Sequence, residues 1–264
     1  MPSSPAAPRT LLRAVRVAAG RPVRGTGAVV LAYHDIRLTP GGYHVTPAQL
    51  AQHIGLVRSA GLRLVPVAAL VDALAAGDDV RDLAAVTFDD ALLGVAELAL
   101  PVLRRLDVPA TVFAVAERLG CEPDWTTGER RTLSADELRD LVGAPGIALG
   151  SHTATHRSLP SLDDDELLAE LAGARATLVG LIGPPVDLLA YPFGHHDDRV
   201  RQAARAAGYR AGFTFLNGRV IAGQDAFRLP RLTMGTHHSR ARWAHHLGRP
   251  ADSWPDTQLP AVRG

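Results

Sequence analysis

The stretch Leu83-Ala84-Ala85-Val86-Thr87-Phe88-Asp89-Asp90 is an apolar run that ends in two adjacent carboxylates. A short, mainly apolar run of this length is typical of a strand buried on both faces, as in a parallel sheet. Ligands of open or closed α/β sheets gather where the strands end. The two aspartates therefore lie where we expect a functional site.

Strand-like and helix-like segments alternate on both sides of this run. The segments with strand character are residues 28–33, 62–65, 84–88, 110–116, 147–150, 187–191, 209–215 and, more weakly, 226–233. Those with helical spacing and end signals are residues 47–59, 67–76, 94–106, 134–142, 162–181 and 198–207. Pro101 predicts a kink within its helix. The alternation predicts an α/β fold, either a closed or nearly closed parallel barrel or an open doubly wound sheet.

Composition limits the class of protein. The chain has 264 residues, of which 47% are hydrophobic, and this fits one large domain with a sizeable core. A formal net charge of +1 gives no support to a nucleic-acid partner. The single cysteine, Cys121, allows no internal disulfide and fits a reducing compartment. We expect a cytoplasmic protein without a transmembrane segment.

The chain divides into three expected regions: a basic arm over residues 1–25, a main domain over residues 26–236, and a C-terminal helix and tail over residues 237–264. The arm carries arginines at intervals and has no apolar core of signal-peptide length. We expect a solvated tail there. Peripheral contact with a membrane surface through an amphipathic helix is the alternative.

A second stretch, Ser151-His152-Thr153-Ala154-Thr155-His156, holds two imidazoles four residues apart. Taken alone, a lone histidine is more often a packed residue, and an aspartate at a strand end is often a turn residue. Together, one carboxylate and two imidazoles form a three-ligand set that leaves an open position on a divalent metal. Successive strand residues point to opposite sides, so Asp89 and Asp90 should differ in role, one as a ligand and one as a base. The set predicts metal-assisted hydrolysis.

Three motifs resemble those of the polysaccharide deacetylases, which contain the NodB homology domain and form carbohydrate esterase family 4. The first is Thr87-Phe88-Asp89-Asp90 with the downstream Val108-Pro109-Ala110-Thr111-Val112-Phe113. The second is Ser151 to His156, and the third is Ala190-Tyr191-Pro192-Phe193-Gly194. The resemblance extends from about residue 28 to about residue 233 of the printed sequence.

The resemblance implies a distorted (β/α) barrel of about seven strands, as in NodB-like domains. It also implies removal of N-acetyl groups from an amino sugar or glycan, with a divalent metal: zinc first, with cobalt, nickel and manganese as alternatives. By position in the motifs, Asp89 corresponds to the catalytic base, and the metal ligands correspond to Asp90, His152 and His156. The residues assigned to substrate binding are Tyr191, Pro192, Phe193 and Arg231.

The general acid is expected to be His34. It lies in Leu31-Ala32-Tyr33-His34-Asp35-Ile36, which resembles the early segment of the poly-N-acetylglucosamine deacetylase branch. A purely structural hydrogen-bonding role at the strand end is the alternative for His34. Late histidines offer weaker context: His237, His238, His245 and His246. Trp125 and Trp243 could stack on a sugar ring or serve only in packing.

Two positions depart from the family pattern. Ala91 replaces a usual glycine after the aspartates, and it would be strained if the position requires a positive φ. Ala190 stands where an arginine often braces the catalytic aspartate, and Arg231 could replace that charge or form only an ordinary ion pair. These departures motivate the alternative of a carbohydrate-binding homologue without activity. A deacylase of a non-sugar amide, with the same chemistry, is a further alternative.

Overall fold

The computed structural model describes residues 27–126, 128–183 and 185–235. The predicted basic arm and the C-terminal tail lie outside the described residues. So do Trp243 and the four late histidines, His237, His238, His245 and His246. The expected three-part division of the chain therefore stays a prediction.

A single parallel sheet forms the centre of the molecule. Its strands are β1 (Val29–Tyr33), β2 (Arg63–Leu64), β3 (Leu83–Phe88), β4 (Ala110–Ala114), β5 (Ile147–Ser151), β6 (Leu188–Ala190), β7 (Ala211–Phe213) and β8 (Leu232–Thr233). Their order is β7-β6-β5-β4-β3-β1-β8, with β2 paired to β3 beside this path. Every strand pairing in this sheet is parallel. The predicted α/β fold with a curled parallel sheet is confirmed.

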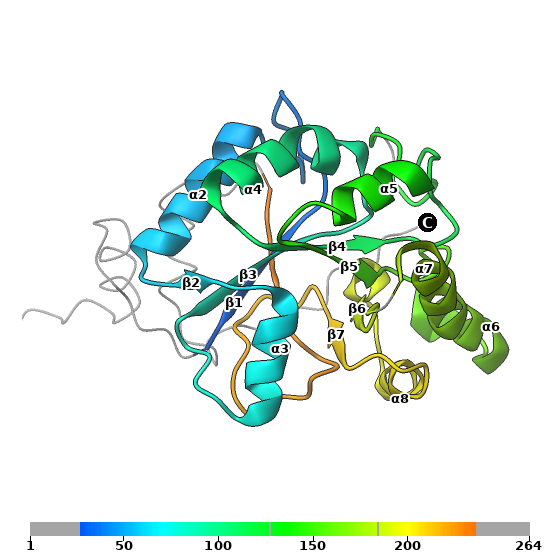
Figure 1. Cartoon of the computed structure of the whole chain (residues 1–264). Helices are drawn as coiled ribbons and strands as arrows, with labels where there is room; N and C mark the ends of the chain where they lie inside the picture. The colour runs from blue at the N-terminus through cyan, green and yellow to red at the C-terminus, as the bar shows by residue number, and fades with distance from the viewer. Residues whose placement is uncertain (1–26, 127, 184, 236–264) are drawn as a thin grey trace, which may run out of the picture.

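Helices surround the sheet, as Figure 1 shows. They are α2 (Pro47–Ser59), α3 (Val67–Ala76), α4 (Leu100–Leu106), α5 (Ala135–Val142), α6 (Asp164–Leu168), α7 (Ala174–Ile182) and α8 (Asp198–Ala206). Short 3₁₀ turns cover Leu159–Ser161 and Pro192–Gly194. Among the described residues, no helix has the length and hydrophobicity needed to cross a bilayer.

Local signals explain where several helices begin. Thr46 caps α2 through a capping box with Gln49, and Ser134 caps α5 in the same way with Glu137. Such caps satisfy backbone N–H groups that have no partner within the helix. The predicted helices 47–59 and 134–142 agree closely with these elements.

Two predicted helices contain a π turn instead of continuous α-helix. Residues Val95–Ala99 form a π turn directly before α4, and the N–H of Leu100 bonds to the carbonyl of Val95. Pro101 follows in the first turn of α4. The kink expected at this proline therefore takes the form of a change from α to π hydrogen bonding in the residues before it. A second π turn, Ala169–Gly173, joins α6 to α7 within the predicted helix 162–181.

The sheet almost closes on itself between β7 and the segment before β8. The N–H of Thr214 donates to the carbonyl of Leu229 at 2.9 Å, and the N–H of Arg231 donates to the carbonyl of Leu216 at 3.0 Å. The predicted strand 226–233 is reduced to two residues, because Pro230 has no N–H for a continuous ladder. This closing seam brings Arg231 to the barrel interior.

The two faces of the sheet carry different packing. One face of β1, β3 and β4 packs with residues of α2, α4 and α5 in the largest hydrophobic cluster. The opposite face forms a second cluster that lines the inside of the curled sheet and includes Val30, Ala85, Phe113, Ala190 and Phe213. Side chains alternate between the two faces along a strand. Some residues just after the strand ends therefore also point to the inner face, at one end of the barrel.

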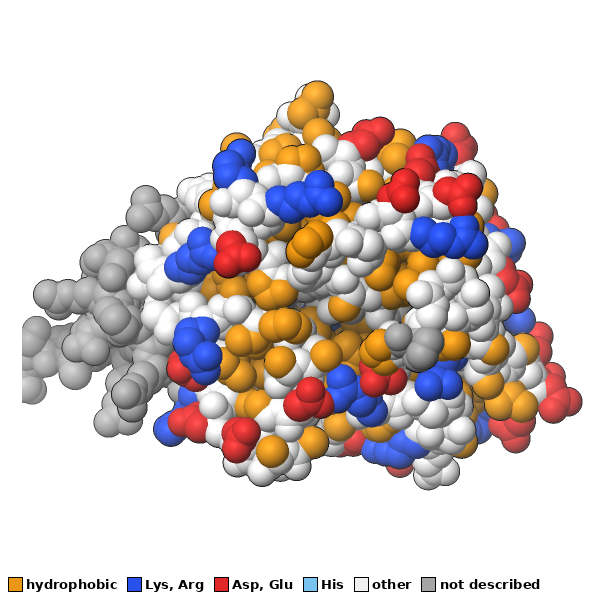
Figure 2. All heavy atoms as spheres, viewed as in Figure 1, with side chains coloured by type: hydrophobic (Ala, Val, Ile, Leu, Met, Phe, Trp, Pro, Cys, Tyr) orange, Lys and Arg blue, Asp and Glu red, His pale blue; other side chains and the backbone are white. Residues whose placement is uncertain are grey.

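The surface is mixed in charge. Figure 2 shows acidic and basic side chains interspersed over the face in view, with apolar areas between them. This agrees with the formal net charge of +1. On that face, the described residues form no field of one sign.

Gly150 tests how tightly the interior is packed. A Cβ at Gly150 would overlap the ring of Phe113 and lie 3.2 Å from the carbonyl oxygen of Leu188. Phe113 is fully buried and has little room to move. We expect Gly150→Ala to lower the free energy of unfolding by about 1–3 kcal/mol, measured by urea denaturation.

The matched control is Gly55→Ala in α2. Gly55 is exposed within a helix, and a Cβ there meets nothing within 4 Å. That substitution should raise the free energy of unfolding by about 0.5–1 kcal/mol because alanine favours helix. Equal urea midpoints for Gly150→Ala and the unaltered protein would contradict this description of the interior.

Candidate active site

The predicted site residues converge at the carboxyl ends of neighbouring strands. Asp89 and Asp90 follow β3, His34 follows β1 and His152 follows β5. The β1, β3, β4 and β5 strands are adjacent in the sheet, so residues far apart in sequence meet at one end of the barrel. This is the arrangement expected from the strand-end motifs.

Asp90, His152 and His156 form a compact buried cluster. One ligand atom from each residue lies within 4.8 Å of the others. The Nε2 atoms of His152 and His156 lie 3.6 Å and 3.5 Å from Oδ1 of Asp90. That oxygen is buried and has no hydrogen-bond partner among the described residues. Two imidazole nitrogens around an unpartnered carboxylate oxygen fit a divalent cation.

The protonation states also fit a cation. Burial lowers the pKa of His152 and lowers the pKa of His156 far below the usual range, and so both rings are neutral near pH 7. Neutral imidazole is the form that binds metals. Burial, followed by the charge of Asp89, raises the pKa of Asp90 well above its usual range. A nearby cation would reverse that shift, since it stabilises the ionised carboxylate.

The ring of His152 is oriented by the third motif. Its Nδ1 lies 2.8 Å from the carbonyl oxygen of Ala190. Because a carbonyl can only accept, Nδ1 carries the proton and Nε2 keeps its lone pair toward Asp90. A bond of this kind fixes the ring and the tautomer of a metal-binding histidine. Ala190, although it lacks the arginine of the family pattern, supports the site through its backbone.

The ring of His156 is held between aromatic side chains. Trp125 stacks on it with ring centroids 4.5 Å apart, and Phe193 meets it edge-on at 4.7 Å. The Nδ1 atom of His156 has no hydrogen-bond partner among the described residues. Trp125 therefore forms one wall of the candidate metal site.

Several site residues have left-handed backbone conformations. The φ angles are 66° for Asp90, 50° for Ala91, 69° for Thr153 and 67° for His156. Ala91 therefore occupies a positive-φ position, which is the condition under which the sequence made it a strained residue. A left-handed conformation costs an L-residue roughly 1–2 kcal/mol, so surrounding contacts must hold these segments in place.

Asp89 points away from the Asp90 cluster and pairs with Arg231. The guanidinium Nη1 and Nη2 donate to Oδ1 and Oδ2 of Asp89 at 2.7 Å and 2.8 Å. Both side chains are completely buried. Burial is the largest influence and would raise the pKa of Asp89, but the charge and hydrogen bonds of Arg231, together with the nearby His152 and His34, outweigh it and lower that pKa overall. Arg231 thus pairs with Asp89, as considered for it from the sequence, and its assignment to substrate binding stays a prediction.

Arg231 is itself held in place on several sides. Its Nε donates to the carbonyl of Thr214 at 3.1 Å, and Nη1 also reaches the hydroxyl of Thr87 at 3.2 Å. The rings of Phe215 and Phe113 lie 4.8 Å and 5.6 Å from its guanidinium carbon. A planar cation suits this bidentate and stacked environment.

His34 lies close to the same pair. Its ring stacks on Phe215 at 5.6 Å and is tilted against Tyr43 at 5.8 Å. Its Nδ1 is buried and has no hydrogen-bond partner among the described residues. Burial lowers the pKa of His34, while the charge of Asp89 acts in the opposite direction. Such an orphaned polar atom is unusual for a histidine with a purely structural role.

The side chains of the third motif point in different directions. Phe193 reaches the ring of His156, and its backbone has a left-handed φ of 57°. Tyr191 points to the other side of the sheet, where its hydroxyl donates to the carbonyl of Phe227 at 3.0 Å. Pro192 begins the 3₁₀ turn between them and is buried. The side chain of Phe193 thus contacts the metal-ligand cluster through His156.

The loop that carries Trp125 is joined to the loop after β1 by ion pairs. Glu129 accepts from Arg37 at 2.9 Å and lies 2.5 Å from Nε2 of His44. Arg37 also pairs with the buried Asp35 at 2.8 Å. Glu129 was missed in the sequence, because nothing local distinguishes it from an ordinary loop acid.

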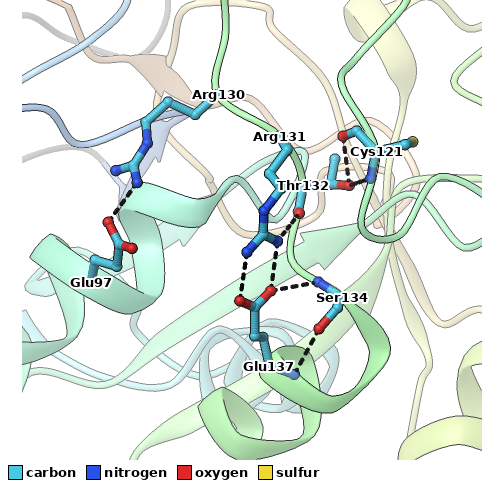
Figure 3. Close-up of polar contacts among 7 residues, drawn as sticks. All are labelled: Glu97, Cys121, Arg130, Arg131, Thr132, Ser134 and Glu137. Atoms are coloured by element: carbon cyan, nitrogen blue, oxygen red, sulfur yellow. Dashed lines mark hydrogen bonds and ion pairs between the residues drawn. The ribbon is translucent and has the colours of Figure 1, made fainter.

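The far end of the same loop is anchored near α5 (Figure 3). Arg131 donates to both carboxylate oxygens of Glu137 at 2.7 Å and 2.6 Å, and these bonds are the main reason that the pKa of Glu137 is lowered to about 2. Thr132 exchanges hydrogen bonds with the backbone of Cys121. These contacts fix both ends of the segment that positions Trp125.

A second acid that was missed in the sequence, Glu170, lies against the histidine loop. It is 4% exposed and accepts hydrogen bonds from the N–H groups of Ala154 and Thr155, each at 2.9 Å. The sequence does contain a signal that Glu170 is buried, because it falls on the same helical face as Leu167 and Leu171, which are buried. A charged residue on the apolar face of a helix is a candidate for a specific buried contact.

Comparisons with known proteins agree with this geometry. The family model described as polysaccharide deacetylase matches residues 76–212, a little over half of the chain. The YxkH protein of Bacillus subtilis (strain 168), whose name refers to the same family, is 23% identical over 162 residues, covering 61% of this chain and 55% of the relative. Chitin deacetylase 1 of Cryptococcus neoformans var. grubii is 25% identical over 123 residues, covering 47% of this chain and 23% of the relative.

The chain thus spans about half the length of YxkH and under a quarter of the chitin deacetylase. Among solved structures, IcaB from Ammonifex degensii superimposes with a TM-score of 0.72 at 25% identity, covering 86% of this chain and 100% of IcaB. The strand-end aspartates, the paired histidines and the matched family model lead to one assignment. The chain belongs to the polysaccharide deacetylase family.

Proposed function

We propose that this protein is a metal-dependent hydrolase that removes N-acetyl groups from an amino sugar or glycan. The observation that carries the proposal is the buried Asp90–His152–His156 cluster directly beside the Asp89–Arg231 ion pair. Family membership supports deacetylation of a sugar amide. The cluster supplies ligands of the right kind, and the ion pair supplies a carboxylate that stays ionised.

Asp90, His152 and His156 would hold the metal, with zinc as the first expectation and cobalt, nickel or manganese as alternatives. A bound divalent cation supplies Lewis acidity toward an acetamide carbonyl and a water molecule. The protein contributes the neutral state of both imidazoles and the fixed direction of the His152 ring.

Asp89 is proposed as the general base. It accepts a proton from the water whose oxygen attacks the acetamide carbonyl carbon. Arg231 keeps Asp89 ionised, and each carboxylate oxygen retains a lone pair beyond the one that Arg231 uses. The C–N bond then breaks, so that acetate and a free amine leave the site. Arg231 acts through Asp89 and takes the place of the arginine absent at Ala190.

His34 is proposed as the general acid that protonates the departing nitrogen. Its ring lies near Asp89 and Arg231, both of which influence its charge state. Because its pKa is lowered, His34 is neutral near pH 7 and becomes an acid only after it receives a proton, for which the proton that Asp89 takes from the attacking water is the source. The unpartnered Nδ1 leaves one ring nitrogen without a competing acceptor.

The third motif is proposed to border the substrate, chiefly through Phe193. Tyr191 uses its N–H in a bond to the carbonyl of Phe213 at 3.0 Å, and Pro192 has no N–H. Between Tyr191 and Phe193, we therefore assign the N–H of Phe193 as the donor for the developing oxyanion. The ring of Phe193, next to His156, would define one side of the acetyl site.

The direct test is release of acetate and free amine. Purified protein loaded with Zn²⁺ or Co²⁺ should deacetylate at least one member of a panel of N-acetylglucosamine oligomers and other N-acetylated glycans. Asp89→Asn should lower kcat by at least about 10²-fold, since general base catalysis contributes 10²–10⁴-fold. Acetate and amine are measured separately.

The outcomes separate the alternatives. Turnover only on non-sugar acetamides would favour the non-sugar deacylase. Sugar binding without turnover, unchanged in Asp89→Asn, would favour a carbohydrate-binding homologue. Absence of both turnover and sugar binding by metal-loaded protein would sink the proposal.

Metal binding gives a second prediction. Asp90→Asn and His152→Ala should each weaken Zn²⁺ binding by orders of magnitude, because each removes one of three ligands. Asp89→Asn should retain the metal, since Asp89 faces Arg231. Isothermal titration with Zn²⁺ measures all three, and loss of metal in Asp89→Asn alone would contradict these assignments.

The ion pair gives a third prediction, on stability. Arg231→Met leaves Asp89 buried without a partner and should cost about 3–5 kcal/mol in the free energy of unfolding. The double variant Arg231→Met with Asp89→Asn removes the uncompensated charge and should regain part of that loss. Urea denaturation of the single and double variants checks this, and strictly additive losses would rule out the coupling.

A further inference from the structure

Glu170 is a buried carboxylate directed at the loop that contains both histidines. Its Oε2 accepts the N–H groups of Ala154 and Thr155, each at 2.9 Å, and its Oε1 accepts the hydroxyl of Thr155. All three donors come from the residues between His152 and His156. A single side chain thus ties the middle of the histidine loop to the helical layer.

That loop needs external support. Thr153 and His156 both have left-handed φ angles, of 69° and 67°. Such conformations persist only where contacts with the surrounding structure hold them in place. On one side, the N–H of Glu117 donates to the carbonyl of Ala154 at 2.9 Å, in continuation of β4. On the other side, Glu170 accepts hydrogen bonds from the N–H groups of Ala154 and Thr155.

The position of Glu170 depends on an irregular helix. It lies in the π turn Ala169–Gly173 between α6 and α7. A π turn inserts one extra residue into a helix and changes which side chains face inward. In this π turn, Glu170 and Leu171 are both buried. A carboxylate, instead of an apolar side chain, therefore faces the loop that contains both histidines. Such turns are found disproportionately at functional sites.

We propose that Glu170 is a positioning residue: it acts as the hydrogen-bond acceptor that holds His152 and His156 in the geometry for one metal ion. The inference rests on the metal site of the proposed function. Glu170 does not contact the candidate metal ligands directly; it acts through the backbone of Ala154 and Thr155. Partners beyond the ligands themselves commonly alter metal affinity by about 10–100-fold.

The test compares three side chains at position 170. Glu170→Met preserves length but removes the acceptors, and it should weaken Zn²⁺ binding by roughly 10–100-fold. Glu170→Gln keeps an amide oxygen that can accept both N–H groups, so it should retain most of the affinity. Competition with a chelator measures the dissociation constant, at a temperature where circular dichroism shows each variant folded.

Glu117→Met is the matched control. Glu117 is exposed, and its backbone touches the same loop, so replacement of its side chain should leave the affinity unchanged. The visible spectrum of Co²⁺-loaded protein gives an independent readout of ligand geometry. It should change in Glu170→Met and stay the same in Glu117→Met.

Thr155→Val provides a milder variant in case Glu170→Met does not fold. It removes one of the three donors and should weaken Zn²⁺ binding less than Glu170→Met does. Unaltered affinity and an unaltered Co²⁺ spectrum in both Glu170→Met and Thr155→Val would overturn the inference, as would an equal loss in Glu170→Gln and Glu170→Met. Failure of the unaltered protein to bind any divalent metal would instead overturn the proposed function.

Discussion

The buried ion pair between Asp89 and Arg231 is the constraint on which the rest of the site depends. Two opposite charges without any solvent exposure are stable only when geometry and hydrogen bonding are good on both sides. Here the carboxylate receives two guanidinium bonds, and the guanidinium also reaches Thr87 and Thr214. The pair fixes Asp89 on one side of the strand end and leaves Asp90 to face the histidines.

Adjacent aspartates consequently have opposite electrostatic environments. Asp89 lies next to a cation that belongs to the protein, whereas Asp90 lies among neutral imidazoles and beside a like charge. The pKa of Asp89 is lowered overall and that of Asp90 is raised. A divalent ion at the histidine cluster would supply the charge that Asp90 lacks. Strand alternation, followed by the left-handed turn at Asp90, separates the two roles over a single peptide bond.

Much of this arrangement could be predicted from the sequence, because it is encoded locally. Apolar runs located the strands, and capping residues such as Thr46 and Ser134 marked helix starts. The motifs at the ends of β3 and β5 identified the candidate ligands. The register of a helix around Pro101, by contrast, depends on competition between α and π hydrogen bonding, which the pattern of residue types does not decide. The contacts of Glu129 and Glu170 depend on how distant loops meet, and no local rule fixes them.

Closure of the barrel also has a consequence for the order in which the site can form. Arg231 lies in the segment directly before the last strand, β8, and follows Asp89, whose charge it neutralises, by 142 residues. Until that segment docks, the inner face of β3 presents a buried negative charge without a counter-ion, which opposes compaction. Docking of the seam removes this penalty and completes the sheet in the same event. A chain with an unclosed barrel therefore lacks the electrostatic setting that keeps Asp89 ionised.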